Sequence, residues 1–248
     1  MRRLALILLA LGLFGARRAQ AAGLNVSPTQ IWLAPDASKA LLTLRNEGHS
    51  EMRLQLAMNT WDEDARTGMK LGPTDAIVFF PAMVVLKPGD TTSVRVGTAL
   101  PFGAIEQTFR LFIDEMPAPA TPQTRSEVRV LTRVGIPIFV APQKTLEDRQ
   151  LSPISVAQGK ASLDVQNTGN VHFRVEAVKL EAKGADGAMV LARSVSGWYV
   201  LAGGHKRYDV EIPKDACARV RRVVMSVKTD RGEIFQQALD TPTGACGS

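Results

Sequence analysis

Short apolar segments with a period of two follow one another along almost the whole chain, from Leu24 to Leu239. Successive side chains of an extended strand point to opposite faces, so this period predicts half-buried β-strands. Clusters of glycine, proline, asparagine and aspartate, which favour turns, separate the segments. The apolar spacing of a long amphipathic helix does not occur in the sequence. The chain is therefore predicted to be all-β.

The same arrangement of strand, turn and strand occurs twice. The turn from Asn46 to Gly48 recurs 121 residues later as Asn167 to Gly169, and a second pair of turns, at Leu86 and Leu201, recurs at an offset of about 115. Such echoes predict two related β-sandwiches in series. A polar stretch from Pro142 to Gln150 marks the expected boundary, which gives domains at 22–142 and 150–248.

The first 21 residues have the composition of an export signal. Two arginines precede an apolar run that is too short to span a bilayer comfortably, and Ala19 and Ala21 fit a cleavage site before Ala22. Without the four arginines of this segment, 26 basic residues face 24 acidic ones, and the formal charge falls from +6 to +2. A nucleic-acid partner is therefore not expected, and we expect a soluble, exported protein.

Few residues of the sequence suggest a disulfide, a catalytic site or a metal-binding site. Cys217 and Cys246 predict one disulfide near the C-terminus in an oxidising compartment, and they belong to no metal-binding pattern. The three histidines are scattered and no Gly-x-Ser-x-Gly is present, so an enzyme is not expected. The acidic run from Asp62 to Asp64 lacks the glycine and distal glutamate of a calcium loop and predicts a solvated loop.

Large aromatic side chains supply much of the apolar area that a β-sandwich core buries. We expect the tryptophans and four phenylalanines to pack into the two cores: Trp32, Trp61, Trp198, Phe102, Phe109, Phe112 and Phe139. Arg95, between two valines of a predicted strand, is expected to lie on the surface.

A long strand is predicted from Val128 to Val140. One face of it, from residue 128 to residue 138, is β-branched throughout. Pro137 has no N–H to donate to a neighbouring strand, so an edge position in the sheet is expected. A long apolar edge invites pairing with another chain, either as aggregation or as the function itself.

Several motifs of the N-terminal half occur together in one order. They are Val26 to Pro28, Ile31 to Leu33, Leu42 to Asn46, Trp61 with Leu71 to Thr74, Phe80-Pro81, Leu86 to Gly89, Ser93 to Val96, Phe109 to Pro117 and Gly135 to Val140. In combination they resemble the periplasmic chaperones of the chaperone–usher pilus pathway. The similarity is greatest to the archaic branch that assembles spore-coat-U-like pili. It covers most of the first domain and, in the second, rests on architecture and the paired cysteines.

The resemblance implies a boomerang-like pair of immunoglobulin-like sandwiches that acts as an ATP-independent periplasmic chaperone. In this family a pilus subunit lacks its final strand, and the chaperone fills the exposed groove by donor-strand complementation before delivering the subunit to an outer-membrane usher. Neither a cofactor nor a nucleotide is implied. The side chains implied to fill the groove are Val128, Val130, Thr132, Val134 and Ile136.

The resemblance also implies a basic pair that binds the subunit's C-terminal carboxylate. At the usual positions of this pair the chain has Gln30 and Pro137, neither of which carries a charge. A carboxylate that leaves water still needs a positive donor. We hypothesise that Arg110 and Arg133, on neighbouring predicted strands, replace the usual pair. The alternative is that both arginines form ordinary ion pairs on a solvated strand face.

Two other functions fit an exported all-β protein. A structural surface or pilus subunit would carry an N-terminal extension of alternating apolar residues, and the segment from Leu24 to Val26 runs straight into the first motif. A cell-envelope binding module would form no 1:1 complex with a subunit. The long apolar edge also makes self-association of the free protein plausible.

Overall fold

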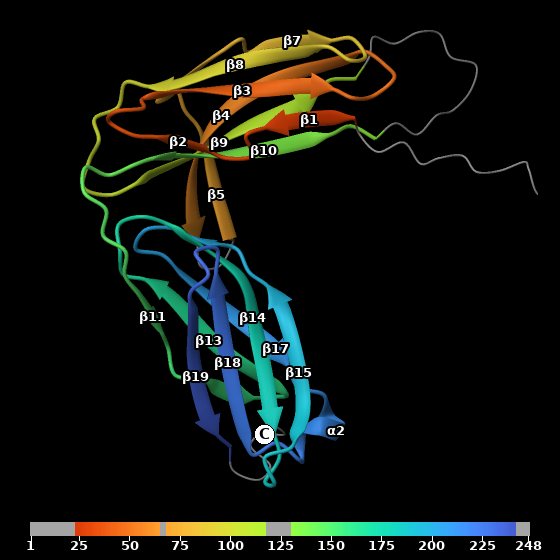
Figure 1. Ribbon diagram of the computed structural model, residues 1–248, viewed down its shortest axis with the longest axis vertical. Helices are drawn as coiled ribbons and strands as arrows, with labels where there is room; N and C mark the ends of the chain where they lie inside the picture. Colours follow the sequence, from red (N-terminus) through yellow and green to blue (C-terminus); the bar gives the residue numbers. More distant parts are fainter. Residues whose placement is uncertain (1–22, 65–67, 118–129, 242–248) are drawn as a thin grey trace, which may run out of the picture.

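The computed structural model describes residues 23–64, 68–117 and 130–241, and it shows two β-sandwich domains (Figure 1). The predicted all-β class is therefore confirmed. Three predictions concern residues outside the described ranges: the export signal at 1–21, Val128 and Cys246. The predicted disulfide stays a prediction for that reason.

The N-terminal domain consists of two sheets. The first has the strand order β1-β3-β8-β6, and the second has the order β2-β10-β9-β4-β5, with β7 paired to β4. The strands of the first are β1 (Leu24–Ser27), β3 (Lys39–Asn46), β8 (Thr91–Thr98) and β6 (Ile77–Phe80). Those of the second are β2 (Ile31–Leu33), β10 (Arg133–Val140), β9 (Gln107–Glu115), β4 (Met52–Asp64), β5 (Gly68–Pro73) and β7 (Met83–Leu86).

The C-terminal domain repeats this plan. One sheet has the order β11-β13-β12 with β17 paired to β13, and the other has the order β15-β14-β18-β19 with β16 paired to β14. The strands of the first are β11 (Arg149–Leu151), β12 (Ser155–Ala157), β13 (Lys160–Asn167) and β17 (His205–Glu211). Those of the second are β14 (Phe173–Lys183), β15 (Met189–Ser196), β16 (Tyr199–Val200), β18 (Arg222–Thr229) and β19 (Ile234–Asp240); the short helix α2 is Lys214–Cys217.

The two repeated turns have the same internal hydrogen bonds. In the first, the buried Asn46 amide donates to the carbonyls of Ser50 and Leu86, and its Oδ1 accepts from the amide of Gly48. The equivalent buried asparagine of the second is Asn167, whose side chain bonds Val171, Val200 and Gly169 in the same way. The repeated sequence pattern therefore corresponds to a buried asparagine that makes the same three hydrogen bonds at the turn of each sandwich.

Each sandwich encloses its own apolar core of alternate strand residues. Leu42 and Val94 of one sheet and Leu111 and Ile138 of the other belong to the N-terminal core. A third cluster lies between the domains and holds Trp61, Phe139, Tyr199 and Leu201. The β4–β5 hairpin reaches from the N-terminal domain toward the C-terminal one (Figure 1).

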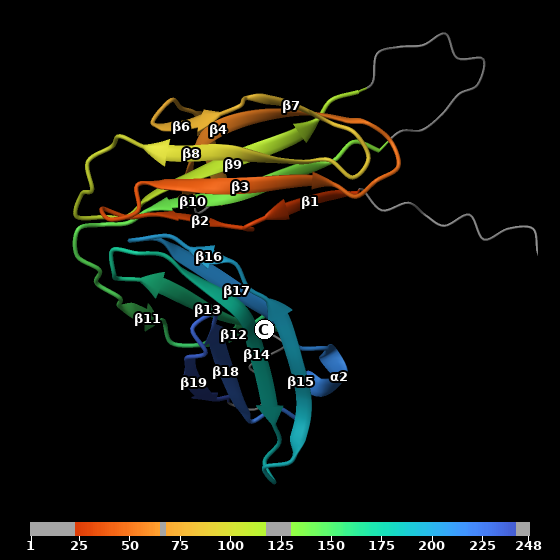
Figure 2. The ribbon, with the colours of Figure 1, turned by 45° about the horizontal axis from the view of Figure 1, so that its top comes forward.

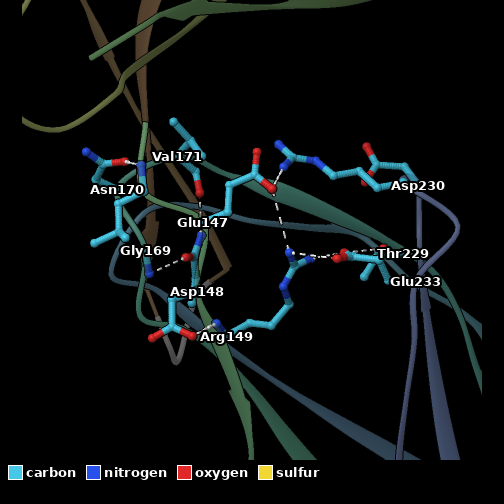
Figure 3. A network of polar contacts seen from close by, with 12 residues as sticks. Glu147, Asp148, Arg149, Gly169, Asn170, Val171, Thr229, Asp230 and Glu233 are labelled. Atoms are coloured by element: carbon cyan, nitrogen blue, oxygen red, sulfur yellow. Dashed lines mark hydrogen bonds and ion pairs between the residues drawn. The ribbon is translucent and has the colours of Figure 1, made fainter. Parts of the chain in front are cut away.

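A charged network joins the start of the C-terminal domain to its last hairpin. The guanidinium of Arg149, 9% exposed, lies 2.5 Å from a carboxylate oxygen of Glu233. Glu147 forms an ion pair with Arg231 and lies 3.8 Å from Arg149 (Figure 3). Because these residues come from the segment that leaves the N-terminal domain and from the β18–β19 turn, they fix the direction in which the second sandwich begins.

The expected burial of the aromatic residues is only partly correct. Phe109 lies in the N-terminal core and Phe102 packs against it, but Trp32 and Trp198 are 46% and 40% exposed. Trp61 and Phe139 are buried between the domains instead of inside a sandwich. For Trp32, Trp61 and Phe139 the physical reason is strand parity, since these side chains point away from the core face of their strands, whereas Trp198 lies between β15 and β16.

Candidate functional site

One stretch of β10 forms an open strand edge. Among the described strands, β9 is the only partner of Arg133 to Pro137, whereas Ile138 to Val140 also pair with β2 on the other side. The expected edge is therefore real for the first part of the strand, and the last part is internal. β2 and β10 border the C-terminal domain in Figure 2.

The hydrogen-bond alternation shows which backbone groups of this edge are free. The amide of Glu115 donates to the carbonyl of Thr132, so these residues form a hydrogen-bonded pair. In an antiparallel ladder such pairs alternate with pairs that share no hydrogen bond. The amides of Arg133 and Gly135 therefore point away from β9, toward the open side. The nitrogen of Pro137 points the same way, so its missing N–H costs no bond to β9.

The five side chains proposed to fill a groove differ in their accessibility. Val130 precedes the strand and is 83% exposed. Thr132 and Val134 are half-buried, and Val134 packs against the N-terminal core. Ile136 is 2% exposed inside that core, so it cannot occupy the groove of another protein at the same time. Val128 lies outside the described residues.

Arg110 lies buried in the cleft between the domains. It is 8% exposed, and its guanidinium lies over the rings of Trp61 and Trp198, 4.5 and 5.5 Å from their centroids. Its Nη1 contacts the sulfur of Met69 at 3.4 Å, and no described residue accepts a hydrogen bond from its Nε. Within the described ranges no carboxylate forms an ion pair with it.

This environment is unfavourable for a cation on its own. Burial lowers the pKa of the Arg110 guanidinium, and only the nearby Tyr199 hydroxyl opposes this effect. Aromatic faces offset part of the lost hydration of a cation but do not neutralise its charge. The arrangement leaves one positive charge and one buried donor ready for an anion.

Arg133 lies in a different setting. It forms a two-point ion pair with Asp114, its partner across the β9–β10 ladder, and its side chain is 68% exposed. Asp114 follows Arg110 by four residues on β9, a separation of about 13 Å along an extended strand. The structure therefore does not bring the two arginines together.

The two positions at which the resemblance implies a basic pair, Gln30 and Pro137, both border the cleft. Pro137 lies directly across the β9–β10 ladder from Arg110, and a Cβ on Gly135 would lie 3.7 Å from its Cδ. Gln30 accepts a hydrogen bond from the Tyr199 hydroxyl at 3.4 Å across the domain boundary. Arg110 of β9 therefore provides a positive charge next to Pro137, the position of β10 at which the resemblance implies a basic residue.

A buried acid–base pair holds the two domains together beside this cleft. The carboxylate of Glu106 lies 2.7 Å from Nδ1 of His172 and also accepts the amide of that residue at 2.9 Å. The imidazole stacks on Phe139 with 3.6 Å between ring centroids. Asn170 adds a hydrogen bond to the carbonyl of Ala104 at 2.7 Å. Together these contacts fix the angle of the cleft.

The β4–β5 hairpin makes a second connection, which corrects an expectation. The run from Asp62 to Asp64 belongs to β4 and is not a solvated loop. Glu63 accepts the amide of Leu201 from the C-terminal domain at 3.3 Å. Burial raises the pKa of the Glu63 carboxyl, against the lowering effect of that hydrogen bond. The hairpin is long because it must reach the other domain.

The alternation of residues in β4 and β10 contains a signal for the cleft. In β4 the core residues Leu54, Leu56 and Met58 occupy even positions, so the odd-numbered Trp61 must point to the opposite face. Phe139 is odd in a strand whose even residues are buried in the core. Parity alone therefore predicts a second apolar surface on the outside of this sheet.

No group of residues in the described part could hold a metal ion. Among the helices of the same residues, none is long and apolar enough to cross a membrane.

The fold and the site define a class: a protein of two β-sandwiches with an open strand edge next to an interdomain cleft that holds a buried, unneutralised arginine. Residues 23–146 match the family model of the pili and flagellar-assembly chaperones, PapD N-terminal domain. Because this match spans half of the chain, the protein belongs to that family. A comparison with curated protein sequences gave no match.

Solved structures share the fold of both domains. A chain of the CsuC–CsuE chaperone–tip adhesion subunit pre-assembly complex, from archaic chaperone–usher Csu pili of Acinetobacter baumannii, is 17% identical with a TM-score of 0.60; the alignment covers 86% of this chain and 97% of that one. A chain of the Salmonella enterica SafA pilin–SafB chaperone complex has 13% identity and a TM-score of 0.55, covering 90% and 98%. The E. coli chaperone DraB has 18% identity and a TM-score of 0.53, covering 88% and 96%.

Proposed function

We propose that this protein is an exported, periplasmic chaperone that caps pilus subunits by donor-strand complementation and passes them to an outer-membrane usher. Family membership supports the general role, and the open edge of β10 carries the specific one. Arg133 and Gly135 offer amides to another backbone at this edge. A subunit that lacks a strand can pair there without any energy source other than binding.

The apolar side chains that lead into β10 would supply the affinity. Val130 is exposed, Val134 is half-buried, and Val128 comes from the segment just before them. Each valine that goes from exposed to fully buried contributes roughly 1.5 to 3 kcal/mol, so Val128 and Val130 together would contribute about 3 to 6 kcal/mol before the cost of ordering the segment. Val134, which is already half-buried, would contribute less. From Ile136 onward, the even-numbered side chains of β10 are buried in the core of the N-terminal domain.

The cleft would bind the C-terminal carboxylate of the subunit. Arg110 provides a charge-assisted donor that has no acid of its own, and a carboxylate there would accept from its free nitrogen. Arg133, which is already paired with Asp114, contributes less to this anchor. In this proposal Arg110 is therefore the main anchor for the carboxylate, and Arg133 is a minor one.

Co-expression with a subunit from the same pilus gene cluster tests the proposal. We expect wild-type protein to keep the subunit soluble in a 1:1 complex, and Arg110→Ala to reduce the co-purified subunit at least tenfold. Arg133→Ala, a matched loss of one exposed arginine, should reduce it less than threefold. Wild-type yield from the Arg110 variant would refute the anchor, and an insoluble subunit with the wild-type protein would refute the chaperone function.

A further inference from the structure

A hollow of about 710 Å³ lies on the outer face of the β1-β3-β8-β6 sheet, outside the site described above. Gly97 of β8 forms its floor. This residue lies between Lys39 of β3 and Val78 of β6 in the strand register, and it contributes no side chain. The missing side chain in the middle of a three-strand row creates the hollow.

The next row of residues forms an apolar wall around one cation. Arg95 of β8 lies between Leu41 of β3 and Phe80 of β6. Leu41, Val78 and Phe80 are 58%, 65% and 72% exposed, although large apolar side chains are usually buried in a domain of this size. Adjacent exposed apolar side chains of this kind mark interaction surfaces.

The charges around the hollow have one sign. Of the described residues that line it, Lys39 and Arg95 alone are charged. Neither belongs to an ion pair in the part of the chain that the structure describes. A complementary partner must therefore bring apolar surface together with negative charge.

The edge of the sheet indicates what kind of partner this is. β6 pairs with β8 on one side, and no described strand lies on its other side. A free backbone edge beside an apolar hollow suits an extended polypeptide, whose amides pair with the edge while alternate side chains enter the hollow. A lipid would use the apolar surface but not the edge.

We propose that this face binds an extended segment of a partner protein that pairs with β6 and carries apolar and acidic side chains on the same face. β6 lies on the side of the N-terminal domain away from the C-terminal domain, whereas β10 lies beside it (Figure 2). Both surfaces can therefore be occupied at once. The proposal stands independently of subunit capping.

Selection from a phage-displayed library of random decapeptides on the immobilised mature protein provides the test. Enriched peptides are synthesised, and their dissociation constants are measured by fluorescence anisotropy for wild type and three variants. Gly97→Val fills the hollow; the φ of Gly97 is not positive, and the tightest neighbour of an added Cβ is the flexible Lys39 side chain at 3.3 Å. Arg95→Glu reverses the central charge. Arg45→Glu, outside the hollow on β3, is the matched control.

We expect enriched peptides with alternating apolar residues and net negative charge, whose dissociation constants rise at least tenfold with Gly97→Val and with Arg95→Glu but not with Arg45→Glu. Peptides without an acidic preference, or affinities insensitive to both variants, overturn the proposal. So do two other occupants: phosphatidylglycerol vesicles that bind in place of peptides and depend on Arg95, or a dimer of this protein that Arg95→Glu dissociates in sedimentation experiments. If Gly97→Val fails to fold, the exposed Arg95 variant decides the result.

Discussion

Arg110 shows how a single residue separates stability from function. A buried cation without an acid is a cost to the free protein, and it persists only where something else uses the charge. The two tryptophans beside it reduce this cost without removing the need for an anion. The residue is therefore expected to matter more for binding than for folding.

Replacing this arginine with methionine tests that separation. Arg110→Met keeps an apolar side chain of similar length between Trp61 and Trp198 and removes the buried charge. We expect the free energy of unfolding to stay within about 1 kcal/mol of wild type, because the lost cation–π contacts and the removed desolvation offset each other. Urea denaturation measures it. A loss of more than about 3 kcal/mol would show that the charge holds the domains together.

The buried turn asparagines make a second test at this scale. Asn46→Ala and Asn167→Ala each remove three hydrogen bonds, of which one is buried at Asn46 and two are buried at Asn167. An unsatisfied buried group costs about 1 to 3 kcal/mol, so Asn46→Ala should lose at least about 1 kcal/mol and Asn167→Ala at least about 2 kcal/mol. Calorimetry should show the loss in the transition of the substituted domain. Equal stability to wild type would contradict the role given to these turns.

At the scale of elements, β10 combines two roles along one strand. Its last residues are internal to the sheet and complete the N-terminal core, while its first residues and the segment before it face an open edge. The sequence pattern predicted the edge because Pro137 is visible in it. The point where the edge ends was not predictable, since pairing with β2 depends on a strand about 100 residues away.

The aromatic residues show the same limit. Their size predicted burial, but the surface that buries Trp61 and Phe139 exists only after the second domain docks. The alternation of residues in β4 and β10 indicates the face of the sheet to which Trp61 and Phe139 point. It does not indicate which part of the chain covers that face. The sequence places Arg110 within a motif, but its neighbours Trp61, Met69 and Trp198 could not be predicted, because they come from β4, β5 and the segment before β16.

An exposed valine allows the donor segment to be tested without disturbing the fold. Val130→Asp should leave the unfolding temperature unchanged, because the side chain is 83% exposed in the free protein. The same change should reduce the yield of co-purified subunit at least tenfold, since a charge would enter an apolar groove. Ile234→Asp, at a 59% exposed position of β19, is the control and should keep wild-type yield. Equal yields from both variants would exclude this segment as the donor.

At the scale of the whole molecule, the angle between the domains is fixed by several unlike contacts. The Glu106–His172 pair closes one side of the boundary, and the β4–β5 hairpin reaches across to Leu201. The aromatic cluster between them includes Trp61. Because Arg110 lies at this boundary, the geometry of its site depends on both domains staying docked.

The contribution of Glu63, in the β4–β5 hairpin, to stability should decrease as the pH rises. The pKa of Glu63 is raised above its ordinary 4.5 in the folded protein, so its contribution is full below that pH and is lost as the pH rises through the raised value. Glu63→Gln should therefore gain stability relative to wild type between pH 4 and pH 8, measured as the difference in unfolding temperature. Glu181, whose pKa the hydrogen bond from Lys179 lowers, gives the control. Its contribution is present above its ordinary 4.5 and is lost only as the pH falls below that value, so Glu181→Gln should differ from wild type by a constant amount over most of this range. A pH-independent difference for Glu63→Gln would contradict the account.

Amide hydrogen exchange on the complex with a subunit tests the central claim most directly. In the free protein the amides of Arg133 and Gly135 face the open side of β10, whereas those of Val134 and Ile136 already donate to β9. Strand addition predicts that exchange at Arg133 and Gly135 slows at least a hundredfold in the complex, while Val134 and Ile136 change much less. A stable 1:1 complex in which Arg133 and Gly135 exchange as fast as in the free protein would contradict strand addition at this edge.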